Sequence, residues 1–131
     1  MSTTVDLAFS GGKKVDATIE GHQVRVDQSV EDGGEGSAPD PAQLFLAAIA
    51  ACSGSVAYSY CQAKGVSPEG LKFSMFCEYD PMEGRYVRLR SEITPPPDFP
   101  EEKKAGLMRA IDRCFVKQHL VNPPVLETVI R

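Results

Sequence analysis

The chain has 131 residues, of which 42 % are hydrophobic and 24 % charged, and its formal net charge at pH 7 is −4. This length fits one domain, residues 1–131, with a real hydrophobic core, and it is too short for two. The acidic balance argues against nucleic acid or an anionic membrane surface as the main partner.

The start of the chain, Met1 to Asp6, is polar and acidic, unlike a signal peptide. The longest apolar run, from Leu44 to Cys52, has 9 residues, too few to span a bilayer. We therefore expect a cytoplasmic protein. In that reducing compartment the four cysteines, at 52, 61, 77 and 114, are core thiols, metal ligands or redox groups rather than a disulfide framework.

Metal binding is disfavoured by the spacing of the candidate ligands. Zinc sites usually contain ligand pairs two to four residues apart. The cysteines form no C-x-x-C pair, and His22 and His119 are isolated from each other. No metal or other bound cofactor is expected.

Alternating apolar and polar residues predict three short strands over 5–9, 14–19 and 22–27, joined by glycine turns. Such a pattern is typical of an antiparallel meander. A glycine-rich acidic loop follows, over residues 30–39. It is long enough to be functional or mobile.

A long helix is predicted over 41–64. Asp40 is its expected N-cap, Pro41 its first residue, and Gly65 its end. The first half is apolar all round, which predicts a central helix covered on every side. Cys61 lies nine residues after Cys52 and faces the opposite side, so these two thiols cannot pair.

The second half of the chain predicts a hairpin with strands over 71–79 and 85–93. Asp98 then caps a helix whose apolar positions include Cys114, and residues 125–130 form a last strand. The predicted order is βββαββαβ, an α+β fold.

Cys52 and Cys114 stand 62 positions apart on different predicted helices. One interpretation is that each is a small packing residue, since free cysteine is usually an inert hydrophobe. Brought together by the fold, they would instead form a peroxide-reactive pair, in which one thiolate becomes a sulfenic acid and the other thiol condenses with it.

The sequence resembles the OsmC/Ohr family, the osmotically inducible and organic hydroperoxide resistance proteins. The resemblance covers nearly the whole chain. Its motifs are a glycine-rich loop, a proline-led helix containing a cysteine, and a late second cysteine: Gly33-Gly34-Glu35-Gly36, Ser37-Ala38-Pro39-Asp40-Pro41, Gln43 to Cys52, Ala63-Lys64-Gly65-Val66 and Cys114-Phe115-Val116-Lys117.

The resemblance implies a metal-free, two-cysteine peroxidase with Cys52 as the peroxidatic and Cys114 as the resolving cysteine. It also implies a domain-swapped homodimer with two central helices between antiparallel sheets and active sites at the subunit interface. The expected partners are a small organic hydroperoxide and a dithiol reductant such as a lipoyl group. An apolar pocket raises a thiol's pKa, so a nearby cation is needed to recover the thiolate.

One part of the family pattern is missing. In the hydroperoxide-resistance branch an arginine and a glutamate activate the first cysteine. Here Ala42 stands in the glutamate's place and Lys13 or Lys14 in the arginine's, while Arg25 and Asp40 are candidate replacements. Lysine supplies charge but not the bidentate fork of arginine. The chain is therefore more similar to the looser OsmC-like branch.

Two hypotheses remain open from the sequence. The first is a thiol-dependent hydroperoxide reductase, favoured by the presence of both cysteines. The second is a binding or accessory protein that keeps the fold and uses an apolar cleft for a small ligand, favoured by the missing glutamate and arginine.

Overall fold

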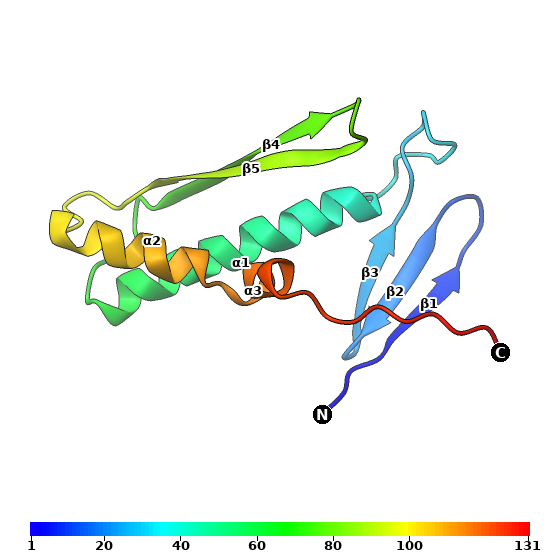
Figure 1. Cartoon of the computed structure of the whole chain (residues 1–131), viewed down its shortest axis with the longest axis horizontal. Helices are drawn as coiled ribbons and strands as arrows, with labels where there is room; N and C mark the ends of the chain where they lie inside the picture. The colour runs from blue at the N-terminus through cyan, green and yellow to red at the C-terminus, as the bar shows by residue number, and fades with distance from the viewer. The chain divides into compact units, whose positions relative to one another are not determined.

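The structure, a computed structural model, describes all 131 residues. They form two compact units, Met1–Leu46 and Ala47–Arg131. The elements are mixed α and β, and every strand pairing is antiparallel (Figure 1). The predicted α+β class is confirmed.

The N-terminal unit contains the predicted meander. Strands β1 (Val5–Phe9), β2 (Val15–Ile19) and β3 (His22–Val26) pair in chain order. Glu20 and Gly21 join β2 to β3, and both have positive φ, 47° and 78°. Two such residues form the tight turn whose twist matches that of the paired strands.

A buried carboxylate organises the loop that follows β3. Asp27 is 1 % exposed and accepts hydrogen bonds from the backbone N–H groups of Gln28, Glu35 and Ser37, and from the Ser37 hydroxyl at 2.6 Å. Gly34 leaves room for this arrangement, because a Cβ there would collide with the Gln28 carbonyl and lie 2.8 Å from Asp27 Oδ1. The loop is thus held by one side chain.

Helix α1 (Pro41–Ala63) begins and ends as the sequence predicts. The Gln43 N–H donates to Asp40 Oδ1 at 2.7 Å while the Asp40 N–H donates to Gln43 Oε1 at 3.0 Å, a reciprocal N-terminal cap. At the other end Gly65 has φ 70°, and the Val66 N–H donates to the Cys61 carbonyl, closing the helix.

The expectation that α1 is covered on every side is wrong for the single chain. Only one stripe of residues spaced four apart is buried: Ile49, Ser53, Ala57 and Cys61. The other faces have no element of the same chain to cover them. By length and composition alone, α1 is long and apolar enough to cross a membrane. The sequence prediction, made from the 9-residue apolar run alone, was that it is too short. Core helices of soluble proteins meet the same criterion.

The C-terminal unit contains the predicted hairpin, β4 (Lys72–Asp80) and β5 (Arg85–Thr94), with a bulge at Glu78/Tyr79. The Asp80 side chain accepts from the Met82 N–H at 2.8 Å and shapes the turn between the strands.

Beyond the hairpin the structure differs from three predictions. Asp98 lies in a turn with φ 65° and caps no helix; a short 3₁₀ turn (η1, Glu101–Lys103) precedes α2 (Lys104–Asp112). The predicted single helix breaks at Arg113 and Cys114 before α3 (Phe115–Val121). Residues 125–130 form no strand, since they pair with no other segment of the chain.

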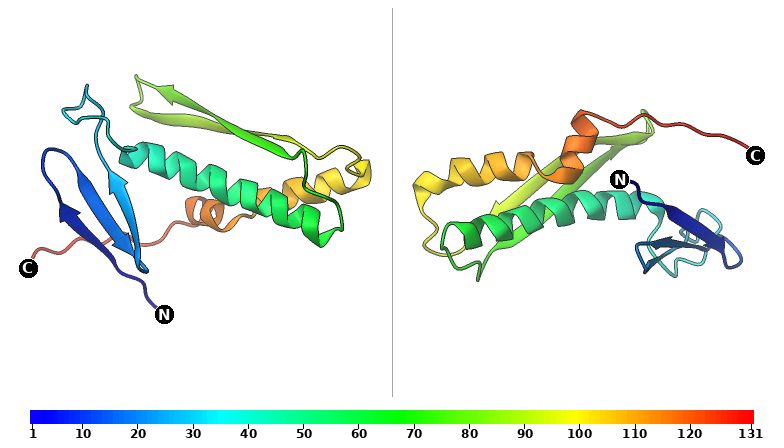
Figure 2. Two further views of the ribbon diagram at one scale, coloured as in Figure 1. Left: turned by 180° about the vertical axis from the view of Figure 1, so that it is seen from behind. Right: turned by 90° about the horizontal axis from the view of Figure 1, so that it is seen from below.

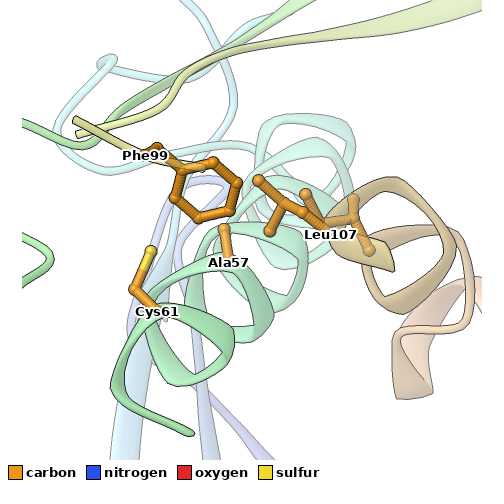
Figure 3. Close-up of a cluster of buried hydrophobic side chains, with 5 residues drawn as sticks. Ala57, Cys61, Phe99 and Leu107 are labelled. Atoms are coloured by element: carbon orange, nitrogen blue, oxygen red, sulfur yellow. The ribbon is translucent and has the colours of Figure 1, made fainter. Parts of the chain in front are cut away.

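The core of this unit lies where α1, α2 and the segment before η1 meet. Figure 2 shows the β4–β5 hairpin and α2 running along α1. Figure 3 shows Phe99, Ala57 and Leu107 pointing toward one another, with Cys61 one turn along from Ala57. Small side chains on α1 allow this close packing.

We expect Leu107→Ala to lower the free energy of unfolding by about 2–4 kcal/mol, because it leaves a cavity in this cluster. Leu107 is 4 % exposed, whereas the next residue, Met108, is 64 % exposed. Met108→Ala is the matched control and should change stability by less than about 0.5 kcal/mol. Urea unfolding of the three proteins measures both values, and equal losses would show that the cluster is not the core.

Asp27 should make stability depend on pH in the acid range. Hydrogen bonds from Ser37, Gln28 and Glu35 outweigh burial and lower the pKa of Asp27 to about 2. A carboxylate whose folded pKa lies below its unfolded value of about 3.9 stabilises the fold above that value, and the contribution is lost as pH falls from about 4 to about 2.

Unfolding of the wild type and of Asp27→Asn between pH 7 and pH 2 measures this effect. The variant should be less stable at pH 7, and the gap should close toward pH 2. Asp6→Asn, on exposed β1, is the control and should follow the wild type. A gap that stays constant with pH would contradict the role given to the carboxylate.

Candidate redox site

Cys52 lies in the middle of α1, one residue before the buried Ser53, and is half-buried. Its side chain lines an open groove of about 450 Å³. The groove walls are mainly apolar and come from α1, α2 and the start of α3: Cys52, Ser55, Val56, Ser59, Tyr60, Ala63, Ala110 and Phe115. Cys52 is therefore a thiol that a small molecule can reach from an apolar surface.

Cys114 lies at the junction of α2 and α3 and is only 2 % exposed. Its N–H donates to the Ile111 carbonyl at 3.1 Å, and its own carbonyl accepts from the Gln118 N–H at 3.1 Å, so it closes one helix and opens the next. The Sγ atom lies 3.6 Å from the Oγ of Ser53, inside the unit. The break between the helices thus points this thiol at α1.

The surroundings of Cys114 favour its ionised form. The largest single influence is burial, which raises the pKa of this thiol. Four other contributions together outweigh burial and place the pKa below its ordinary value: the Lys117 backbone N–H, the Ser53 hydroxyl, the Cys52 thiol and the Lys117 charge. Hydrogen bonds to a thiolate act in this direction whenever the donors are already in place.

The Cys52 side chain is one of the groups that lower the pKa of Cys114, so the two thiols lie near enough to interact. Both thiols are free in this structure. A half-exposed thiol next to a buried, ionisable one can pass between a dithiol and a disulfide when an oxidant or reductant reaches the outer sulfur. The catalytic roles given to Cys52 and Cys114 by the sequence stay predictions.

The other two cysteines occupy different surroundings. Cys61 is fully buried in the core cluster, and burial raises the pKa of its thiol, so it is an inert packing residue. Cys77 lies on β4, where its Sγ donates weakly to the Met75 carbonyl at 3.8 Å. No group of three or more His, Cys, Asp or Glu side chains is placed to hold a metal ion.

The candidate activating residues belong to the N-terminal unit. Lys14 Nζ lies 2.7 Å from Glu35 Oε2, and Arg25 forms a two-pronged contact with Asp16 at 2.8 and 3.3 Å. Asp40 caps α1. Lys13 lies in the turn between β1 and β2. An activating role for any of them stays a prediction.

Sequence reasoning did not single out Ser53 and Lys117. One signal was available: Ile49, Ser53, Ala57 and Cys61 follow one another at four-residue spacing, which places Ser53 on the buried stripe. His119 packs its ring on Phe115 with 4.6 Å between ring centroids, and its Nδ1 lies 2.8 Å from the Phe115 carbonyl.

Comparison of the structure with solved proteins identifies the fold. A Psychrobacter arcticus protein described as an osmotic stress induced and detoxification response protein is 16 % identical, with a TM-score of 0.76 over 90 % of this chain and 88 % of its own. An OsmC-like protein from Mycoplasma pneumoniae is 18 % identical (TM-score 0.67, 92 % and 88 % covered). An organic hydroperoxide resistance protein OsmC from Legionella pneumophila is 21 % identical (TM-score 0.61, 92 % and 89 % covered).

At such low identities these likenesses show the fold alone, which is the α+β fold of the OsmC and organic hydroperoxide resistance proteins. The sequence profile of the OsmC-like protein family matches residues 34–129. Because this match spans most of the chain, the protein belongs to the OsmC-like protein family, as the resemblance predicted. No match was found among curated protein sequences.

Proposed function

We propose that the protein is a thiol-dependent peroxidase that reduces organic hydroperoxides to alcohols. The observation that carries this proposal is the placement of a groove-lining thiol, Cys52, beside Ser53, whose hydroxyl lies 3.6 Å from the sulfur of the buried Cys114. Membership of a family that includes organic hydroperoxide resistance proteins supports it.

The first step is attack of the Cys52 thiolate on the distal oxygen of the hydroperoxide. A sulfur–oxygen bond forms and the O–O bond breaks; the alkoxide takes up a proton and leaves as the alcohol. The Cys114 thiolate then attacks the sulfur of the Cys52 sulfenic acid. A disulfide forms, and hydroxide leaves as water after taking up a proton.

The groove favours an organic over a small polar peroxide. Val56, Ala63 and Phe115 give it apolar walls, so an alkyl or aryl group gains free energy by leaving water. Polar contacts come from Ser55 and Ser59. The proposed substrate therefore has an apolar body and a hydroperoxide end that reaches Cys52.

An external dithiol, such as a lipoyl group, would return the disulfide to two thiols, so that no bound cofactor or metal takes part in the proposed cycle. The cycle needs a compartment that supplies reduced dithiols, and we propose the cytoplasm for that reason.

A second candidate is a protein that binds a small apolar ligand in the same groove without efficient turnover. The observation in its favour is that Ala42 replaces the glutamate expected in the peroxidase branch, while Lys14 and Arg25 are engaged with acidic partners of their own. Such a protein would keep the fold and lose the activation of Cys52.

We further propose that the protein acts as a homodimer. Large apolar side chains are exposed on the single chain, including Phe9 at 79 % and Phe115 at 75 %. The C-terminal residues are more exposed still, with Ile130 at 97 %. Apolar surface of this kind usually marks an interface, and a second copy is the partner that the family fold favours.

Peroxidase activity can be tested by following cumene hydroperoxide consumption with dihydrolipoamide as the reductant. The wild type should turn over, and Cys52→Ser should fall to the uncatalysed rate. Cys114→Ser should turn over more slowly than the wild type, because its sulfenic acid must be resolved by the external dithiol instead of by Cys114. Cys77→Ser is the matched control, since its thiol lies on the hairpin, and it should keep wild-type activity.

Thiol counting separates the two candidate functions. One equivalent of peroxide should remove two of the four thiols of the wild type. No turnover with four thiols remaining would eliminate the peroxidase and leave the ligand-binding protein, which should then show saturable binding of an apolar alcohol in the groove.

Sedimentation at micromolar concentration tests the homodimer. The wild type should sediment as a dimer, and Ile130→Asp should raise the dimer dissociation constant about tenfold or more, since a charge would be buried in the interface. Thr128→Asp introduces the same charge on the same tail beside the apolar positions and should have a much smaller effect. A wild type that sediments as a monomer would contradict the proposal.

A further inference from the structure

We propose that the bond between Asp32 and Gly33 is a site of self-modification, at which the aspartate isomerises to isoaspartate, and that Ser29 slows this reaction. The site lies in the loop between β3 and α1, within the N-terminal unit. The reaction takes place inside one chain, so it is independent of the proposed thiol chemistry and of a second copy.

Asp32–Gly33 is the only aspartyl-glycyl bond in the chain, and the chain contains no asparaginyl-glycyl bond. In aspartate isomerisation the backbone nitrogen of the next residue attacks the side-chain carboxyl. Glycine has no Cβ beside that nitrogen, so the approach is least hindered there. Gly33 has φ 92°, a conformation that favours glycine. The shape of the loop therefore requires the residue that makes this bond reactive.

Hydrogen bonds in the folded loop hold both reacting groups. The Ser29 hydroxyl donates to Asp32 Oδ2 at 3.0 Å, and it accepts from the Asp32 N–H at 3.2 Å. The Gly33 N–H, which must lose its proton before the nitrogen can attack, donates to the Val30 carbonyl at 3.1 Å. Attack on the carboxyl therefore requires the loop to give up both contacts, and Ser29 supplies the one that comes from a side chain.

The reaction balances with water as its only co-reactant. With the Asp32 carboxyl protonated, the Gly33 nitrogen loses its proton and bonds to the carboxyl carbon, and the hydroxyl leaves as water with that proton. The five-membered succinimide so formed takes up one water from the solvent, since both residues are exposed. Breaking the nitrogen bond to the backbone carbonyl gives isoaspartate, and breaking the new bond restores aspartate. No electrons are transferred, and the mass is unchanged.

Isomerisation lengthens the main chain by one carbon atom at a point that the hydrogen bonds of the loop span. The Gly34 N–H donates to the Ser29 carbonyl at 2.9 Å, and the Ser37 N–H donates to Asp27 Oδ2 at 3.1 Å. In both pairs the donor follows the modified bond and the acceptor precedes it. The added carbon displaces the donors from their acceptors, so the modified loop should lose part of its attachment to Asp27.

Ageing of the full-length protein tests the site. The protein is kept for several weeks at neutral pH in water enriched in heavy oxygen, and its peptides are mapped by mass spectrometry with fragmentation that distinguishes isoaspartate. Isoaspartate carrying heavy oxygen should accumulate at position 32. Asp6, which is exposed on β1 but precedes Leu7, is the matched control and should stay unmodified. Absence of isoaspartate at position 32, or equal amounts at position 6, would overturn the proposal.

Variants test the part played by Ser29. Ser29→Ala should raise the isomerisation rate about two- to tenfold, because one hydrogen bond no longer holds the carboxyl. Ser29→Thr keeps a hydroxyl and should restore the rate of the wild type. Ser67→Ala removes a hydroxyl that accepts from the Glu69 N–H in another exposed turn, and it should not change the rate. An unchanged rate in Ser29→Ala, or a raised rate that Ser29→Thr does not restore, would overturn the protective role.

The effect on the loop is measured on the modified protein, separated from the unmodified form by ion exchange. Hydrogen exchange of the Gly34 and Ser37 N–H groups should be about tenfold faster in the isoaspartate form, because these groups lose their acceptors. Asp32→Glu keeps the charge but does not readily close a five-membered ring, so its exchange should stay constant on ageing. Equal exchange at these groups in the modified and unmodified forms would overturn the link between isomerisation and the loosened loop.

Discussion

The structure of the C-terminal unit depends on the burial of one narrow stripe of α1. Its members are an isoleucine, a serine, an alanine and a cysteine at four-residue spacing: Ile49, Ser53, Ala57 and Cys61. Three of the four are small, so neighbouring elements approach the helix backbone closely. Larger side chains at these positions would force the hairpin and α2 away and would separate the groups that now meet at Cys114.

The break between α2 and α3 follows from the same packing. Leu107 and Ile111 bury their side chains in the cluster with Ala57 and Cys61 of α1, and α2 ends at the next residue, Asp112. Ending α2 at Asp112 and starting α3 at Phe115 turns the thiol inward while Phe115 stays on the groove wall. One irregular junction thus supplies both the inner sulfur and part of the surface around the outer one.

Local patterns in the sequence were sufficient for the strands and for both ends of α1, because alternation, an Asp-Pro start and a terminal glycine act within a few residues. They did not predict the helix break, since Leu107, Ile111 and Cys114 keep helical spacing across it. Residues 125–130 have the composition of a strand, but a strand also needs a partner. The family resemblance suggested the cysteine pair. Ser53 has the pattern of an ordinary packing residue, so the sequence did not mark it as a neighbour of Cys114.

The loop held by Asp27 contains two glycines that are needed for different reasons. Gly36 has φ 63°, and the nearest atom would lie 3.9 Å from an added Cβ, so there is space for a side chain. What limits this position is its left-handed backbone conformation, which asparagine adopts more readily than most residues. Gly34 is constrained by volume, because any side chain would displace the Gln28 carbonyl. In a scan of all substitutions, asparagine at position 36 should therefore preserve the fold, whereas every substitution at position 34 should destabilise it. The two glycines of one loop thus differ in the substitutions that they tolerate.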